Sequence, residues 1–209
     1  MIRILVADDH AIVREGLKRI IRDSPDMEVV AEAANSAETI AEAQRTSPDV
    51  VLLDISMPGR GGLDTLKELK RLLPKTRVLM LSMHPEDQFG PRFLKEKADG
   101  YMTKESAPEL LIGAIRKLHG GGKYLSPALA EHLAASLDRS FDQPPHELLS
   151  AREFQVLRLI ASGKTVGEIS AELALSVKTV STYRTRVLEK MNLKNNAELM
   201  HSAMQAGLV

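Results

Sequence analysis

The chain has 209 residues, of which 44% are hydrophobic and 27% are charged, a composition typical of a globular protein with an apolar core. It contains no cysteine, which excludes disulfides, cysteine-ligated metal centres and cysteine nucleophiles and favours a cytoplasmic location. Its 28 basic residues balance its 28 acidic ones, which argues against a nonspecific nucleic-acid coat but leaves room for a local basic surface.

Residues 2–123 alternate between short apolar runs and amphipathic stretches. Runs typical of β-strands occur at Ile4–Ala7, Val29–Ala31, Val50–Leu53, Val78–Leu81 and Tyr101–Met102. Apolar residues at helical spacing predict helices over Ala11–Asp23, Ala37–Thr46, Leu63–Leu73, Arg92–Lys97 and Pro108–His119. The strands are continuous apolar runs, as expected when helices cover both faces of a sheet. This alternation predicts an α/β doubly wound domain over residues 1–123, with a parallel five-stranded, flavodoxin-like sheet.

Residues 124–146 have the composition of a linker, with one short helix over Ala128–Leu137. Residues 147–209 carry no strand pattern and predict an all-α domain of four helices. Three of these helices have a capping side chain three residues before a glutamate, at Ser150 and Glu153, Thr165 and Glu168, and Asn195 and Glu198. Ser176 can cap the remaining helix, and Gly163 and Gly207 stand where helix C-caps belong.

Polar side chains follow four of the five predicted strands. They are Asp8, Asp9, Asp54, Ser82, Thr103 and Lys104. One aspartate at a strand end is usually a helix cap, and Asp9 can cap the helix from Ala11. The set together is expected to converge, because the carboxyl ends of the strands in an open α/β sheet line one crevice. Its oxygen ligands suit Mg²⁺ or Mn²⁺, and a lysine and a hydroxyl beside the metal predict a site of phosphoryl transfer.

Basic residues gather between Ser176 and Lys194, where five of them stand against one glutamate. On a helical wheel, Val180, Val187 and Met191 point one way and small polar residues point the other. A short helix over Thr165–Leu173 precedes this helix by a tight turn. Basic residues are also common on helix faces that only meet solvent. Here, however, the short preceding helix gives the spacing of a helix-turn-helix. The pattern therefore predicts a helix presented to the major groove of DNA.

The polar set of the first domain resembles the receiver domain of bacterial two-component response regulators, as does the sequence Met57-Pro58-Gly59 after Asp54. The resemblance implies that Asp54 is the phosphoacceptor, that Ser82 binds a phosphoryl oxygen and that Lys104 pairs with the phosphate. It implies a Mg²⁺ site made of Asp8, Asp9, Asp54 and the backbone carbonyl of Ser56. Tyr101 matches the aromatic switch position, whose ring moves when Ser82 does.

Residues 147–209 resemble the LuxR-type DNA-binding domain, so that the whole chain resembles a NarL/FixJ-family response regulator. Matched by position, the expected base readers are Ser181, Thr182 and Thr185. The expected phosphate contacts are Lys178, Thr179, Arg186 and Lys190. Tyr183 stands where many relatives carry histidine, and its hydroxyl is as well suited to reach a phosphate as to cap the core.

The resemblance implies a transcriptional regulator rather than an enzyme, with any phosphotransfer or dephosphorylation confined to its own Asp54. The expected partners are a sensor histidine kinase, double-stranded DNA and, after phosphorylation, a second copy of the chain. No apolar run is long enough to predict a membrane partner. The chain departs from the common pattern at Gly90-Pro91, placed at the start of the fourth helix, and at Lys97, where a glycine is frequent. These departures affect the surface expected to form the dimer.

Three alternatives remain open on the sequence alone. The first is a Mg²⁺-dependent phosphohydrolase with Asp54 as nucleophile, although such enzymes often have a second acid where this chain has Ser56. The second is a DNA-binding protein controlled by a small ligand, which would need an apolar cavity in place of the acidic crevice. The third is a receiver that works without phosphorylation, which the complete acidic set disfavours.

Overall fold

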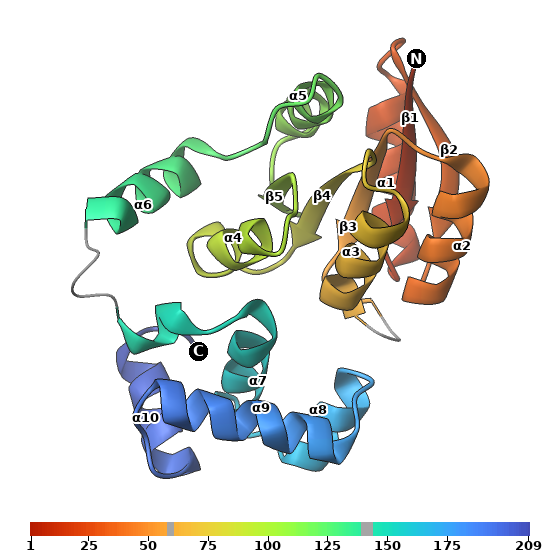
Figure 1. The fold of residues 1–209 in the computed structure, drawn as a ribbon. Helices are drawn as coiled ribbons and strands as arrows, with labels where there is room; N and C mark the ends of the chain where they lie inside the picture. The colour runs from red at the N-terminus through yellow and green to blue at the C-terminus, as the bar shows by residue number, and fades with distance from the viewer. Residues whose placement is uncertain (58–60, 139–143) are drawn as a thin grey trace. The chain divides into compact units, whose positions relative to one another are not determined.

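The structure is a computed structural model that describes residues 1–57, 61–138 and 144–209. It divides into two compact units, Met1–His132 and Leu133–Val209, the first built around a sheet and the second helical (Figure 1). The division falls inside the segment 124–146, for which the sequence predicts a linker. Pro58 and Gly59 of the motif after Asp54, and residues 139–143 of the predicted linker, lie outside the described residues.

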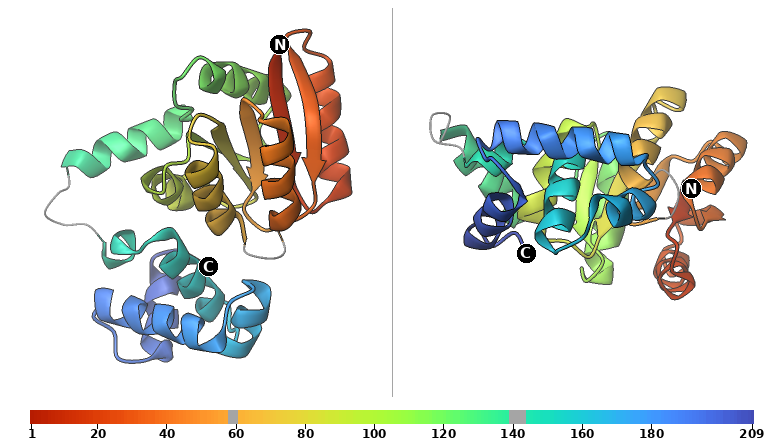
Figure 2. Two further views of the ribbon diagram at one scale, coloured as in Figure 1. Left: turned by 45° about the vertical axis from the view of Figure 1, so that its right-hand side comes forward. Right: turned by 90° about the horizontal axis from the view of Figure 1, so that it is seen from below.

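The first unit is a five-stranded sheet in the order β2-β1-β3-β4-β5, with every neighbouring pair parallel. The strands are β1 Ile2–Ala7, β2 Met27–Ala33, β3 Val50–Asp54, β4 Arg77–Ser82 and β5 Gly100–Thr103. The helices between and after them are α1 Ala11–Arg22, α2 Ser36–Thr46, α3 Gly61–Leu72, α4 Glu86–Lys95 and α5 Pro108–His119. Helices α1 and α5 cover one face of the sheet, and α2 and α3 the other (Figures 1 and 2). This confirms the predicted doubly wound, flavodoxin-like fold.

The core of this unit follows from the period of two along each strand. In β1, Ile2, Ile4 and Val6 belong to one buried cluster together with residues of α1 and α5, among them Ile21 and Leu111. Of the intervening residues of β1, Leu5 and Ala7 are also buried, because α2 and α3 cover the opposite face. The continuous apolar runs of the sequence are therefore explained by helices on both sides.

Helix α4 differs from the prediction. It begins at Glu86, so that Pro91 lies inside the helix and not in its first turn. An internal proline has no N–H to donate and disturbs the preceding turn, at a cost of about 3 kcal/mol. Phe89 and Phe93 are fully buried on one face of α4, and this apolar burial offsets the cost. Beyond the helix, Lys97 adopts the left-handed φ of 70° that glycine accommodates more easily.

The second unit is a bundle of short helices. Its elements are the turn η1 Pro145–Leu148 and the helices α7 Ala151–Ala161, α8 Val166–Glu172, α9 Val177–Lys190 and α10 Asn196–Gln205. Ser150, Thr165, Ser176 and Asn195 all cap these helices as predicted, each by accepting a hydrogen bond from a backbone N–H three residues ahead. Gly163 and Gly207 have positive φ after α7 and α10, which confirms both C-caps.

Helix α6, Pro127–Asp138, joins the two units and confirms the short helix predicted in this segment.

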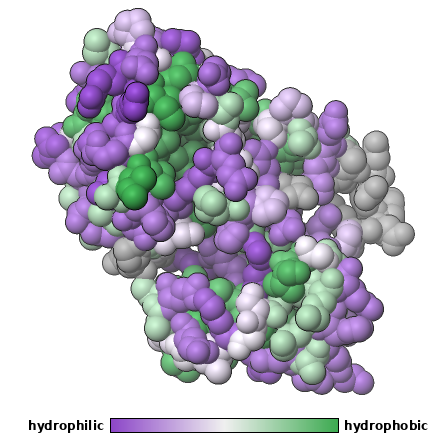
Figure 3. All heavy atoms as spheres, turned by 180° about the vertical axis from the view of Figure 1, so that it is seen from behind, coloured by the Kyte–Doolittle hydropathy of each residue, from purple (hydrophilic) through white to green (hydrophobic). Residues whose placement is uncertain are grey.

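On the face drawn in Figure 3, hydrophilic side chains predominate and hydrophobic ones appear between them. In the part of the chain that the structure describes, no helix combines the length and the apolar character needed to cross a membrane.

Candidate functional site

The predicted acidic crevice forms at the carboxyl ends of β1 and β3, which are neighbours in the sheet. Asp8 follows β1 and Asp54 ends β3, and both side chains are almost completely buried. Lys104, just after β5, reaches between them, with its Nζ 2.6 Å from Asp8 Oδ2 and 3.0 Å from Asp54 Oδ2. Residues from three strands are therefore brought together at the point where the strand order reverses, which is where ligands bind in such folds.

The charges of this crevice are strongly coupled. Burial raises the pKa of Asp54 above its ordinary value, and the ion pair with Lys104 only partly opposes that effect. For Lys104, burial acts to lower the pKa, but the contacts with Asp8 and Asp54 outweigh it and raise the pKa. The single ammonium group thus faces two buried carboxylates, so the crevice holds more negative charge than one lysine neutralises.

The crevice fits a hard divalent cation. Asp8 Oδ2 and Asp54 Oδ2 are buried atoms without a hydrogen-bond partner of good geometry, although both lie near the Lys104 ammonium group. Asp8, Asp9, His10 and Asp54 each offer a ligand atom within 4.8 Å of the others. Carboxylate oxygens are the ligands that Mg²⁺ prefers. Sequence reasoning missed His10, whose position directly after the two aspartates was the available signal.

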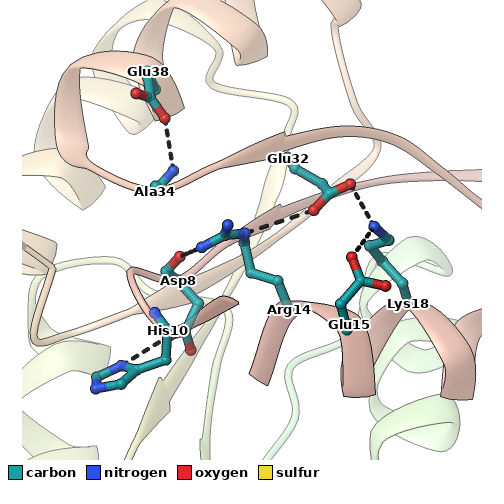
Figure 4. A network of polar contacts seen from close by, with 8 residues as sticks. All are labelled: Asp8, His10, Arg14, Glu15, Lys18, Glu32, Ala34 and Glu38. Carbon is teal, nitrogen blue, oxygen red and sulfur yellow. Dashed lines mark hydrogen bonds and ion pairs between the residues drawn. The ribbon is translucent and has the colours of Figure 1, made fainter. Parts of the chain in front are cut away.

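Asp8 is held in place through its main chain. The Arg14 guanidinium donates a hydrogen bond of 2.7 Å to the Asp8 carbonyl and lies 3.6 Å from the Glu32 carboxylate (Figure 4). The Asp8 side chain accepts from the His10 N–H at 2.9 Å. Asp9 makes no cap for α1, since the N-cap residue is His10 and it has no side-chain capping bond. Asp9 instead contacts His10 Nδ1 at 2.8 Å, beside the crevice.

Ser56, Ser82 and Tyr101 lie around this crevice. The Ser56 N–H donates to Asp54 Oδ1 at 3.2 Å, and Ser82 ends β4 with a buried side chain. The Lys104 N–H donates to the Ser82 carbonyl at 2.8 Å, which ties the two residues together across the sheet edge. Tyr101 is fully buried in β5, and its hydroxyl donates to the His84 carbonyl at 3.0 Å. The ring of the expected switch residue therefore points inward.

In the second unit, α8 and α9 form the predicted helix-turn-helix, with Ala174 at a φ of 51° in the turn between them. Val180, Val187 and Met191 are buried, as the helical wheel predicts. The exposed residues of α9 include Lys178, Ser181, Thr182, Thr185, Arg186 and Lys190. The hydroxyls of Thr182 and Thr185 donate back to the carbonyls of Lys178 and Ser181 in the previous turn.

Three residues of α9 have contacts or a degree of burial that the helical wheel does not predict. Lys190 Nζ lies 2.7 Å from Glu153, a buried carboxylate at the start of α7. The Arg184 guanidinium donates to the Asn196 side chain at 2.6 Å and so ties α9 to α10. Tyr183 is partly buried. Lys190 therefore has a role inside the domain in addition to the predicted contact with phosphate.

The chain matches two family models. Residues 4–116 match the response regulator receiver domain, and residues 147–203 match the LuxR family of bacterial regulatory proteins. It is 40% identical to the response regulator GacA of Pseudomonas viridiflava over 100% of this chain and 98% of the relative. It is 36% identical to the response regulator UvrY of Escherichia coli K12 over 100% of this chain and 96% of the relative.

Solved structures give the same result. RcsB of Salmonella enterica serovar Typhimurium, bound to a promoter in the presence of phosphomimetic BeF3⁻, aligns with 97% of this chain and 98% of that one, at a TM-score of 0.72 and 28% identity. A LuxR-family response regulator from Aurantimonas covers 66% of this chain and 98% of its own, at a TM-score of 0.62 and 36% identity. Proteins of this kind are DNA-binding regulators and not classical enzymes, which rejects the phosphohydrolase alternative. The chain belongs to the NarL/FixJ family of two-component response regulators, transcriptional regulators in which a receiver domain precedes a LuxR-type helix-turn-helix domain.

Proposed function

We propose that Asp54 accepts a phosphoryl group, either from the phosphohistidine of a sensor kinase or from a small acyl phosphate. A carboxylate oxygen of Asp54 attacks the phosphorus, the bond to the donor nitrogen or oxygen breaks, and the donor leaves with that electron pair. The observation that carries the proposal is the burial of Asp54 beside Asp8 and Lys104 at the carboxyl end of the sheet. This geometry places the acceptor carboxylate beside one ammonium group and beside a second carboxylate that could hold a cation.

The neighbouring residues have separate roles in this proposal. Asp8, Asp9, Asp54 and the Ser56 carbonyl would hold Mg²⁺, which when bound neutralises the phosphoryl oxygens. The Lys104 ammonium, which pairs with two carboxylates before transfer, would pair with the new phosphate. The Ser82 hydroxyl would bind a phosphoryl oxygen and leave its contact with the His84 N–H, which it accepts at 3.0 Å. The loop to α4 and the Tyr101 hydroxyl bonded to it would then rearrange.

The DNA-binding unit supplies the output. We infer that α9 enters the major groove of duplex DNA, where Ser181, Thr182 and Thr185 face the bases. Lys178, Thr179, Arg186 and Lys190 would contact the phosphates. The exposure of these base readers opposite the buried Val180 and Val187 supports this, as does the RcsB structure bound to a promoter. Two phosphorylated copies would bind half-sites about 34 Å apart. Because the target is DNA, this action takes place in the cytoplasm.

The proposed acceptor is tested by incubating the full chain with acetyl phosphate and Mg²⁺ and measuring its mass. The wild-type chain is expected to gain one phosphoryl group, and Asp54→Ala is expected to gain none. Chelation of Mg²⁺ should also prevent the gain, since clustered carboxylates need a cation to admit a phosphate. Asp23→Ala removes an exposed carboxylate at the end of α1 and serves as the control. Normal phosphorylation of Asp54→Ala would reject the assignment.

A further inference from the structure

The surface of α4 has a notch at Gly90, and a side chain from the linker helix α6 fills it. A Cβ atom placed on Gly90 would lie 2.8 and 2.9 Å from the two Cδ atoms of Leu129. Leu129 is itself only 1% exposed. Two heavy atoms cannot remain that close, so an alanine at position 90 would force the buried Leu129 side chain to shift. The glycine that departs from the common sequence pattern thus has a specific contact.

A polar contact holds the start of the same helix. The Ser126 hydroxyl donates to the Glu86 carboxylate in the first turn of α4. The oxygen of that hydroxyl also accepts a hydrogen bond from the Leu129 N–H at 3.1 Å, as an N-cap does. The residue that caps α6 is therefore the one that α4 binds. Helix α6 begins where it does partly because Glu86 orients its cap.

The chain between α5 and α6 is held against β5. The Tyr124 N–H donates to the Asp99 carbonyl at 2.9 Å, and Tyr124 forms a parallel bridge with Gly100. A Cβ on Gly100 would lie 2.9 Å from the Cβ of Tyr124. Two glycines, one in β5 and one in α4, thus create space for two consecutive contacts of the linker. The linker follows a defined path across the receiver from Tyr124 to Leu129.

A neighbouring face of α4 packs towards the expected switch residue. The ring centroids of Phe93 and Tyr101 are 6.1 Å apart, and those of Phe89 and Phe93 are 6.5 Å apart. Phe89 in turn stacks on His84, whose carbonyl accepts the Tyr101 hydroxyl bond. A movement of Tyr101 would therefore change contacts along the buried face of α4, while Leu129 is packed on Gly90 of the same helix.

We infer that α4 is a docking surface for the linker helix of its own chain, with the Gly90 notch and Glu86 as its two binding points. While α6 is docked, this part of α4 is closed to a second receiver. The switch in α4 that follows phosphorylation of Asp54 releases α6, and this second statement rests on the proposed function. The docked helix is thereby the element through which the receiver controls the linker to the DNA-binding unit.

The docking is tested with a pair of glycine-to-alanine variants in the full chain. Gly90→Ala adds a methyl group that meets Leu129, whereas Gly113→Ala adds one in α5 where no atom lies within 4 Å. Alanine ordinarily stabilises a helix relative to glycine, but at position 90 its Cβ also meets the ring of Pro91 in the next position. Gly113→Ala therefore controls for helix propensity, and the Leu129→Ala background controls for the strain before Pro91. Amide hydrogen exchange of residues 129–133 is expected to be about tenfold faster or more in Gly90→Ala and unchanged in Gly113→Ala.

A second background keeps the result interpretable if Gly90→Ala also perturbs α4. Leu129→Ala removes the atoms that clash and should by itself speed exchange in α6. Adding Gly90→Ala to Leu129→Ala should then produce no further change, because the two substitutions act on one contact. Equal exchange in wild type and Gly90→Ala, or additive effects in the double variant, would overturn the docking.

The release is tested by the same exchange measurement on wild type treated with acetyl phosphate and Mg²⁺. Mass measurement on the same sample reports how much Asp54 is phosphorylated. Faster exchange of residues 129–133 in the phosphorylated fraction is the expected result, and unchanged protection in a fully phosphorylated sample overturns the release. Absence of any phosphoryl adduct counts against the proposed function instead, and the glycine pair still decides the docking.

Discussion

Asp99 is a buried carboxylate that belongs to the receiver scaffold and not to the crevice. It pairs with Lys70 at the end of α3 and with Arg77 Nη1 at 2.9 Å, and it accepts the Val78 N–H at 2.8 Å. Burial alone would raise its pKa, but these donors outweigh burial and hold the pKa below the ordinary value of 3.8. The charged form of Asp99 therefore stabilises the junction of α3, β4 and β5.

Asp99→Asn is predicted to lower the free energy of unfolding by about 2 kcal/mol at pH 7, because it leaves the partly buried Lys70 and Arg77 without their charge partner. Since the folded pKa is lowered, the contribution of Asp99 is present above about pH 4 and is lost as the pH falls through the folded pKa. Urea denaturation between pH 7 and pH 3 measures both effects. The difference between wild type and variant should shrink on acidification.

The control for Asp99 is Asp26, whose pKa is lowered to about 2 by a bidentate hydrogen bond from Arg116. That pair is exposed, so water screens it and Asp26→Asn should hardly change stability. A loss of stability at Asp26 equal to that at Asp99 would contradict the account. It would mean that the pKa shift alone, and not burial, decides what an ion pair contributes.

At the level of single residues, part of the acidic crevice could be predicted from the sequence. Asp8, Asp54, Ser82 and Lys104 each follow an apolar strand, and parallel topology alone brings them together. The partner of Lys190 could not be predicted, because Glu153 lies 37 residues earlier and its signal is that of a capping box. A local pattern shows which side chain caps a helix, but it does not show which distant cation the same carboxylate binds.

At the scale of single elements, α9 offers two lysines for comparison. Among the described residues no carboxylate pairs with Lys178, whereas Lys190 pairs with Glu153. Lys178→Ala is predicted to weaken binding to all DNA sequences alike, to reduce the salt slope by about one unit per protomer and to leave stability unchanged. Lys190→Ala should also lower the free energy of unfolding by about 1 kcal/mol, since it leaves Glu153 buried without its cation. Salt-dependent binding and thermal melting distinguish the two.

Thr182 and Thr185 are predicted to set sequence preference rather than overall affinity. Thr182→Val keeps the shape of the side chain and removes its hydroxyl, so it should cost about 1–3 kcal/mol at particular base pairs with little change in salt slope. Phosphates repeat along the duplex, whereas the donors and acceptors of the major groove differ from base to base. Selection of binding sites at two salt concentrations measures this. A uniform loss with unchanged preference would mean that α9 presents another face to the groove.

The first residue of helix α4 could not be predicted from the sequence. A proline normally marks a helix start, and Gly90-Pro91 therefore predicted a helix from Arg92. Instead the helix extends back to Glu86, because Phe89 and Phe93 pack into the core. Tertiary burial decided this boundary against local propensity. By contrast, the caps of α7 to α10 depend on neighbouring residues only, and all four were predictable.

At the scale of the whole molecule, the chain divides into two compact units, Met1–His132 and Leu133–Val209. The acidic crevice lies in one unit and the helix-turn-helix in the other. Regulation through Asp54 therefore requires that a change at this residue alters a property of α9, although none of the site residues named above belongs to both sites. Coupling of this kind is a free-energy difference, and values of 1–3 kcal/mol correspond to changes in affinity of roughly 5- to 150-fold.

The most direct test measures binding of the full chain to a duplex selected with the phosphorylated protein, before and after treatment with acetyl phosphate and Mg²⁺. Wild type is predicted to bind about tenfold more tightly or more after treatment. Asp54→Ala is predicted to bind with the same affinity in both conditions. The contradicting result would be an unchanged affinity for the duplex. It would have to be seen in wild type that mass measurement shows to be fully phosphorylated on Asp54.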